Sequence, residues 1–194
     1  MERSKIIRER PFCFSPANQI TLSVDLTGEI GQEKLNQAIR MAVRHHARLM
    51  SRILQEENGD CFFSVDPAEE PRQVAIDYLE SDAPDQLAAI IHDQERLLFD
   101  VEKGELLRFF VVSHADRLQL VIVAHHLVGD GLALVYLLQD IMRGLSEANT
   151  TMPVAPLQQH DLATMPAKVK LPLMLRLLCR SMNLQWKRSR DRKS

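Results

Sequence analysis

The chain has 194 residues, of which 45% are hydrophobic and 26% charged, a balance typical of a folded globular domain that excludes an intrinsically disordered chain. The net charge of -2 conceals an asymmetry, because residues 1–150 carry 15 basic and 24 acidic side chains and residues 151–194 carry 9 basic and 2 acidic ones. Three scattered cysteines exclude a disulfide scaffold and a cysteine zinc site, so we expect a reducing, cytoplasmic setting. No apolar run reaches the roughly 20 residues of a membrane span.

The first half of the sequence predicts strands around one long helix. Residues 18–27 alternate apolar and polar side chains, as a half-buried strand does. Apolar positions at three-four spacing predict a helix over about 32–50. Two strand-like runs at 51–54 and 61–65 flank a polar, glycine-containing turn, which predicts a hairpin. A further short strand is expected at 73–79.

The second half predicts a helix, two paired strands and another helix. The capping residue, early proline and acidic turn at 81–85 predict a helix that continues to about Leu98. Strands are predicted at 106–114 and 118–126, and the second is apolar on both faces, as in a central strand that is covered on both sides. A strongly apolar helix is predicted at 132–145. This order predicts an α/β fold in which a mixed, largely antiparallel sheet packs against helices.

Residues 151–194 differ in character from the rest and form a second predicted region. The 173–186 stretch is helix-like, with basic residues among Leu and Met, and a charged tail follows it. Because aromatic residues are not interleaved with these charges, we expect a basic helical connector and no nucleic-acid partner. The domain boundary is therefore expected near residue 150.

The segment from His125 to Gly131, with the sequence HHLVGDG, carries the candidate chemistry. The histidine pair ends the apolar strand, and a helix begins directly after the turn. An imidazole in this place can meet a substrate, and its unperturbed pKa near neutrality suits a general base, although a histidine on an apolar strand is more often a core residue. Asp130 is better placed to hold the turn or cap the helix than to touch substrate. The flanking glycines permit close backbone approach and positive φ.

A metal site at this histidine pair is not expected. Adjacent residues on a strand point to opposite faces of the sheet, so His125 and His126 cannot easily share one ion.

The same segment resembles the HHxxxDG signature of the condensation-domain and chloramphenicol-acetyltransferase-like acyltransferases. The resemblance covers about residues 15–145 and includes the family's opening strand and first helix, its second motif at 45–53, and the segment at 99–108 that precedes the signature. It implies a two-layer chloramphenicol-acetyltransferase-like lobe. It also implies transfer of an acyl group from a coenzyme A or carrier-protein thioester to a hydroxyl or amine, as in nonribosomal peptide synthesis. The thioester brings its own activation, so no bound cofactor or metal is implied.

The resemblance also implies roles for single residues. His126 would be the general base that takes the proton from the nucleophile, and His125 would be its structural neighbour. Asp130 would fix the turn through a cationic partner. Arg108, on the neighbouring predicted strand, is the candidate partner, and strand register decides whether the two can meet. Gly131 and the helix N-terminus would bring backbone amides to the site.

Family members of this kind have two similar lobes, and the motifs found here are those of the N-terminal lobe. We therefore expect residues 1–150 to form that lobe and residues 151–194 to lead toward a second one. The expected partners are a second lobe in cis or in trans, or a second copy of the chain, with a carrier protein as a further candidate. The alternative is a non-catalytic lobe that serves as a docking module for carrier proteins.

The second motif departs from the family pattern at Ala47 and Met50, where Glu or Pro and Arg are usual. The departure at Met50 puts in doubt any ion pair built from that arginine. The preceding His45 and His46 are expected in the middle of the helix as packing or capping residues. Cys61 is expected to be a small core residue.

Overall fold

The structure is a computed structural model that describes residues 2–7, 10–13, 18–66, 74–81, 83, 85–115 and 117–146. Contacts between Cα atoms divide the chain into residues 1–159 and residues 160–194, and all described residues belong to the first unit. The predicted helix at 173–186 and the predicted connector lie outside the described residues. Within the part of the chain that is described, no helix is both long and apolar enough to cross a membrane.

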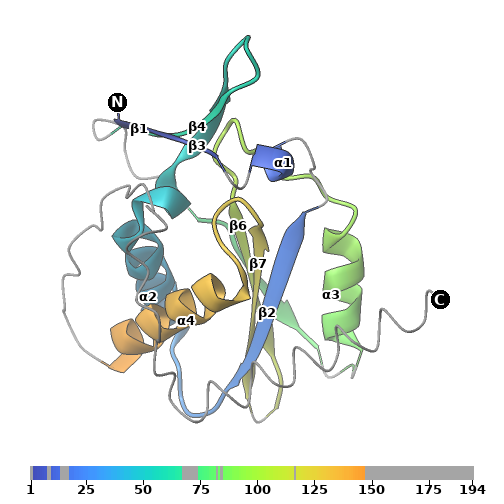
Figure 1. Ribbon diagram of the computed structural model, residues 1–194. Coiled ribbons are helices and arrows are strands. Elements are labelled where there is room, and N and C mark those ends of the chain that lie inside the picture. Colours follow the sequence, from blue (N-terminus) through green and yellow to red (C-terminus); the bar gives the residue numbers. More distant parts are fainter. Residues whose placement is uncertain are drawn as a thin grey trace. The chain divides into compact units, whose positions relative to one another are not determined.

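A four-stranded sheet forms the centre of the first unit (Figure 1). Its strands are β2 (Gln19–Leu26), β5 (Ile76–Glu80), β6 (Leu107–Ser113) and β7 (Leu118–His125), in the order β2-β7-β6-β5. All neighbouring pairs are antiparallel except β5 and β6, which run parallel. The sheet is therefore mixed and largely antiparallel, and β7 is a central strand, as its apolar sequence predicts.

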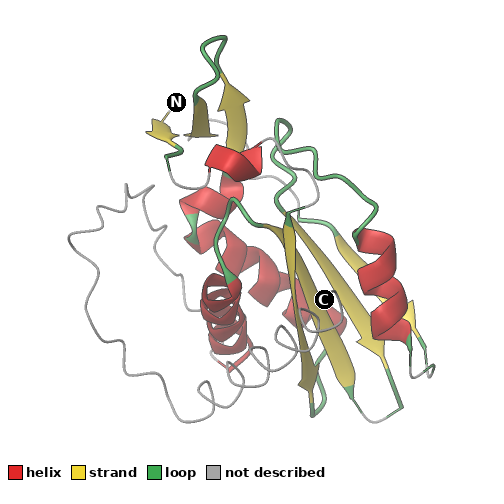
Figure 2. Cartoon of the chain, turned by 45° about the vertical axis from the view of Figure 1, so that its right-hand side comes forward, coloured by secondary structure: helices red, strands yellow, loops and turns green. Residues whose placement is uncertain are grey.

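Helices cover both faces of this sheet (Figure 2). On one side α2 (Gln32–His45) and α4 (Gly131–Ser146) pack against each other, so closely that a Cβ on Gly144 would lie 3.2 Å from the Cβ of Ala38. On the other side lies α3 (Gln86–Gln94). A separate apolar cluster lies on this side of the sheet. It contains Ile90, Phe99, Phe110, Val112, Val121 and Val123.

A smaller antiparallel sheet has the strand order β1-β4-β3. The hairpin of β3 (Arg52–Gln55) and β4 (Cys61–Val65) is confirmed, and Cys61 is buried as expected. The first strand, β1 (Glu2–Lys5), and the short helix α1 (Arg10–Cys13) were not predicted. Only one side chain of β1 is buried. The strand therefore lacks the alternation of apolar and polar residues from which it could have been predicted.

Two predicted helices are shorter in the structure. The first ends at His45, because His46 adopts extended angles (φ -107°, ψ 103°), and the 3₁₀ helix η1 (Ala47–Met50) follows it. His45 and His46 thus lie at the end of α2 rather than in its middle. The helix predicted from residue 81 to about Leu98 spans only α3, and Leu98 lies beyond its end with 61% of its surface exposed. The neighbouring Phe99 takes the buried position instead.

Candidate functional site

The end of β7 holds the histidine pair by its backbone. The N–H of His125 donates to the carbonyl of Leu106 at 3.0 Å, and the N–H of His126 donates to the carbonyl of Asn18 at 2.7 Å. These carbonyls precede β6 and β2, the two strands that flank β7. Both histidines are therefore fixed between two neighbouring strands at the point where the chain leaves the sheet.

His125 belongs to the core. Its side chain is buried, with 2% exposure, and its ring edge meets the ring of Phe99 at a centroid distance of 5.7 Å. Its Nδ1 accepts a hydrogen bond from the backbone N–H of Leu127 at 3.2 Å, and its carbonyl accepts one from the N–H of Val128. These contacts order the turn after the strand.

His126 lies in a different environment. It is partly buried, and its ring stacks on Phe12 of α1 with a centroid distance of 4.6 Å and an angle of 22° between the planes. The described part of the chain offers no hydrogen-bond partner to either ring nitrogen of His126. Phe12 was missed at the sequence level because it lies in a segment without periodicity.

Asp130 caps α4. Its Oδ1 accepts hydrogen bonds from the backbone N–H groups of Leu132 and Ala133, both at 3.0 Å, and its carbonyl accepts one from the N–H of Leu134 at 3.3 Å. Aspartate is among the preferred N-cap residues because it satisfies such orphan donors. Gly131 is the first residue of α4. Most of the backbone N–H groups that were expected to face the site instead donate hydrogen bonds to Asp130.

Gly129 is required by close packing rather than by its backbone angles. A Cβ built on Gly129 would lie 2.4 Å from the Cβ of Ala133, one turn into α4. Neither Gly129 nor Gly131 has a positive φ, and the described glycines that do are Gly28, Gly59 and Gly104. The expectation of close approach is confirmed at Gly129, and the expectation of positive φ is wrong at both glycines of the motif.

Arg108 connects β6 to the segment that follows α3. Its Nε donates to the Glu105 carboxylate at 2.7 Å, and its other nitrogens donate to Gln94 Oε1 at 2.9 Å and to the Leu98 carbonyl at 2.7 Å. The guanidinium lies over the ring of Phe99, 4.1 Å from the centroid. Through its hydrogen bond, Arg108 lowers the pKa of Glu105 below its ordinary value.

The predicted pairing of Arg108 with Asp130 is therefore wrong. In the observed register Arg108 lies opposite Val123, so its side chain lies on the α3 face of the sheet, the face that also carries Phe99. Asp130 instead lies beyond the end of β7, at the start of α4 on the other face. Arg108 contacts the Phe99 ring, and the Phe99 ring in turn contacts the ring of His125.

Asp140 on α4 has a place that the sequence did not reveal. Its Oδ2 lies 2.9 Å from Nε2 of His46 at the end of α2. Only the packing of α2 on α4 brings these residues together, since they are 94 positions apart in the sequence. No local pattern could have indicated the pair.

A pocket of about 370 Å³ lies at the opposite end of the sheet from His126. The strand register places it where β6 ends and β7 begins. Its lining residues are Glu80, Ser81, Ser113, His114 and Ala115. His126 is therefore not among the residues that line this pocket.

A family model described as "Condensation domain" matches residues 15–164. Among curated proteins, the chain is 28% identical over 152 residues to nonribosomal peptide synthetase 5 of Gibberella zeae, which covers 76% of this chain and 1% of the synthetase. It is 30% identical over 131 residues to a dimodular nonribosomal peptide synthase of Bacillus subtilis, which covers 66% of this chain and 5% of that protein. The chain thus spans only a small fraction of the length of these relatives.

Solved structures share the fold. The condensation domain of the monacolin K polyketide synthase MokA superposes with a TM-score of 0.63 at 13% identity, over 77% of this chain and 36% of that one. The first condensation domain of the calcium-dependent antibiotic synthetase gives a TM-score of 0.63 at 15% identity, over 76% of this chain and 37% of that one. These likenesses confirm the predicted α/β lobe, and with the family match they show that the chain belongs to the condensation-domain family.

Proposed function

We propose that this chain supplies one wall of a condensation-type acyl-transfer site in which His126 is the general base. The observation that carries the proposal is the contrast within the histidine pair. His125 is buried and its Nδ1 is engaged, whereas His126 is partly exposed and its ring nitrogens have no partner among the described residues. A general base must be held in position and able to accept a proton. The backbone hydrogen bond of His126 and its ring nitrogens, which have no partner among the described residues, support this role.

The proposed reaction joins an acyl thioester to an amine or hydroxyl. A ring nitrogen of His126 accepts the proton of the nucleophile while the nucleophile attacks the thioester carbonyl carbon. The carbon–sulfur bond then breaks, and the sulfur leaves as a thiol with the proton. The donor is a coenzyme A or phosphopantetheinyl thioester, which needs no metal or bound cofactor for activation. Asp130 and Arg108 act on the site indirectly, since one caps α4 and the other supports Phe99 beneath His125.

We further propose that a second lobe, joined in cis or supplied in trans, provides the other wall, and that carrier proteins deliver the substrates. The share of the solved structures that the chain covers supports this, because the chain spans about a third of the condensation structures, 36% and 37% in the two cases above.

The test measures acyl transfer by the chain paired with a second condensation lobe. Thiol release from an acyl thioester reports the turnover. His126→Ala should lower turnover by about 10²–10⁴-fold, the usual contribution of a general base, while the thermal midpoint stays near that of the wild type. His92→Ala is the matched control, because His92 is exposed on α3 and lies outside the site. Equal turnover by the two variants would contradict the assignment and favour the docking-module alternative, which predicts carrier-protein binding without turnover.

A further inference from the structure

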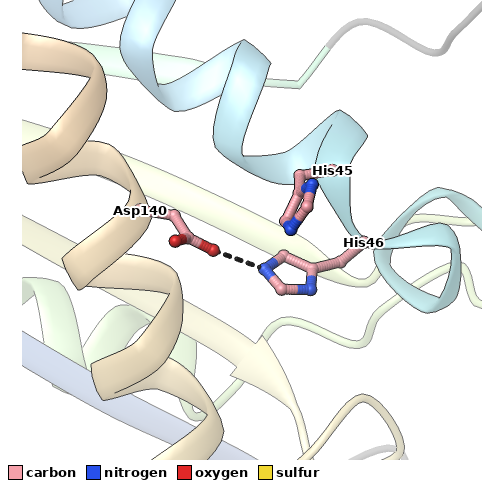
Figure 3. A group of neighbouring side chains, drawn as sticks. All are labelled: His45, His46 and Asp140. Carbon is pink, nitrogen blue, oxygen red and sulfur yellow. Dashed lines mark hydrogen bonds and ion pairs between the residues drawn. The ribbon is translucent and has the colours of Figure 1, made fainter. Parts of the chain in front are cut away.

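Two histidines and a carboxylate converge between α2 and α4, away from the site at the end of β7. His45 and His46 end α2, and Asp140 lies on α4, about 14 Å along the helix axis from its first residue. One ligand atom from each side chain lies within 4.8 Å of the others, and His46 Nε2 is 2.9 Å from Asp140 Oδ2. Figure 3 shows the His45 ring and the Asp140 carboxylate directed toward the His46 ring.

The backbone explains how adjacent histidines can face one point. In a strand their side chains would point to opposite faces. Here His45 is the last helical residue and His46 is extended, so the chain turns between them. The two rings lie 4.9 Å apart between centroids at an angle of 73°. The objection that applies to the pair at the end of β7 therefore does not apply to this pair.

The end of α2 also favours a cation at this place. His45 and His46 lie at the C-terminus of the helix, where the negative end of the helix dipole favours positive charge. Among the described residues, His45 makes a ring contact with His46 and no hydrogen bond through its side chain. The ring is therefore not held by another polar contact.

Asp140 is already oriented for such a role. Its Oδ1 accepts a hydrogen bond from Arg143 at 3.0 Å, one turn along α4, and this leaves Oδ2 directed at the histidines. Hydrogen-bonded carboxylates of this kind are typical around metal sites, where outer partners orient the ligands. Only 12% of the Asp140 side chain is exposed. The carboxylate is therefore held in place within the helix pair.

We propose that His45, His46 and Asp140 bind a divalent transition metal ion of the zinc class. Two imidazoles and one carboxylate are a common three-residue set for Zn²⁺, with ligand distances of about 2.0–2.2 Å and a fourth position left for water. Ligand atoms of a tetrahedral site lie about 3.3 Å apart, so small side-chain rotations suffice to reach it from the observed positions. The ion would clamp the end of α2 to α4. This proposal is independent of acyl transfer.

The experiment uses the full 194-residue chain, stripped of metal with a chelator. Zn²⁺ binding is measured by calorimetry, and Co²⁺ is added as a spectroscopic probe whose visible absorption reports the coordination geometry. We expect one tight Zn²⁺ site, and at least tenfold weaker binding in each of His45→Asn, His46→Asn and Asp140→Asn. His92→Asn is the control, because His92 is an exposed histidine of α3 and should leave the affinity unchanged.

His45→Asn separates a metal site from a plain ion pair. The side chain of His45 has no hydrogen-bond partner among the described residues, so its loss leaves the contact of His46 with Asp140 intact. If the cluster is only an ion pair, His46→Asn and Asp140→Asn lower the thermal midpoint in chelator while His45→Asn does not, and Zn²⁺ affinity is the same in all variants. Equal Zn²⁺ affinity of the wild type and His45→Asn would overturn the proposal even if the ion binds elsewhere on the chain.

Discussion

His125 and His126 show how one step along a strand separates two roles. Successive side chains point to opposite faces, so His125 enters the apolar layer beneath α3 while His126 turns toward Phe12. The neutral His125 ring carries its proton on Nε2, because its Nδ1 accepts from a backbone N–H. Two adjacent histidines therefore have different surroundings, since one is a buried core group and the other is a partly buried group stacked on an aromatic ring.

The Asp130 cap predicts a specific pattern of stability. Asp130→Ala leaves the N–H groups of Leu132 and Ala133 without their acceptor, so the free energy of unfolding should fall by about 1 kcal/mol. Asp130→Asn retains a capping oxygen and should lose far less. Urea denaturation of both variants measures the difference. An equal loss in both would mean that the charge, rather than the cap, is what stabilises the turn.

The close approach of Gly129 to Ala133 predicts that a substitution at one position can compensate for a substitution at the other. Gly129→Ala forces a Cβ against that of Ala133, which should destabilise the fold by about 1–3 kcal/mol. Ala133→Gly alone costs about 1 kcal/mol of helix propensity, but it removes the obstructing methyl group. The double variant should therefore be more stable than the sum of the single effects predicts. Additive losses in denaturant melts would show that the clash relaxes elsewhere.

Elements with strong local periodicity could be predicted from the sequence, and those set by distant contacts could not. The alternation in β2, the apolar run of β7 and the spacing in α4 are local, and all three elements are present. The strand β1 has a mostly exposed sequence and forms through pairing with β4. The end of α3 was predicted wrongly for the same reason. Phe99 rather than Leu98 is buried because Phe99 packs in the apolar cluster with Ile90 of α3, a contact that the local sequence does not indicate.

Site prediction followed the same division. The strand-end position of His126 and the capping role of Asp130 follow from residues close together in the sequence. The partner of Arg108 depends on register and on the fold of the segment after α3, so it was assigned wrongly. The stacking of Phe12 on His126 likewise arises only in three dimensions.

The ion pair of Arg108 and Glu105 should contribute to stability in a pH-dependent way. Arg108 holds the pKa of Glu105 below its ordinary 4.5, and the backbone N–H of Asp100 adds a further bond. Because the folded pKa is the lower one, this stabilisation is complete above pH 4.5 and is lost as the pH falls through the folded pKa. Partial exposure of the Glu105 side chain, 38%, limits the effect to below about 1 kcal/mol.

Glu105→Gln tests the pH dependence of this ion pair. Its free energy of unfolding should lie below that of the wild type by a constant amount from about pH 5 to 8, and the two should converge at lower pH. Glu102→Gln is the matched control, because Glu102 is an exposed acid in the same turn. A gap between wild type and Glu105→Gln that stays constant down to pH 3 would contradict the mechanism.

At the scale of the whole molecule, the proposed function assigns to the described residues the base and one wall of the site. A chain that spans about a third of the solved condensation structures is expected to catalyse slowly alone and to associate through the face where a second lobe docks. Addition of a condensation C-terminal lobe should raise thiol release and produce a single sedimenting species together. A monodisperse monomer that turns over at ordinary enzyme rates, roughly 1–10³ s⁻¹, would show that one lobe suffices.

The double pairing of β7 has a consequence for the motions of the site. Amide protons of this strand are shielded by β2 on one side and β6 on the other, and those of His125 and His126 extend the shielding past the strand end. Such protons exchange with solvent deuterium only when much of the domain opens. The backbone beneath His126 should therefore be among the slowest-exchanging parts of the chain, so that any adjustment to a substrate falls to Phe12 and the imidazole ring rather than to the strand.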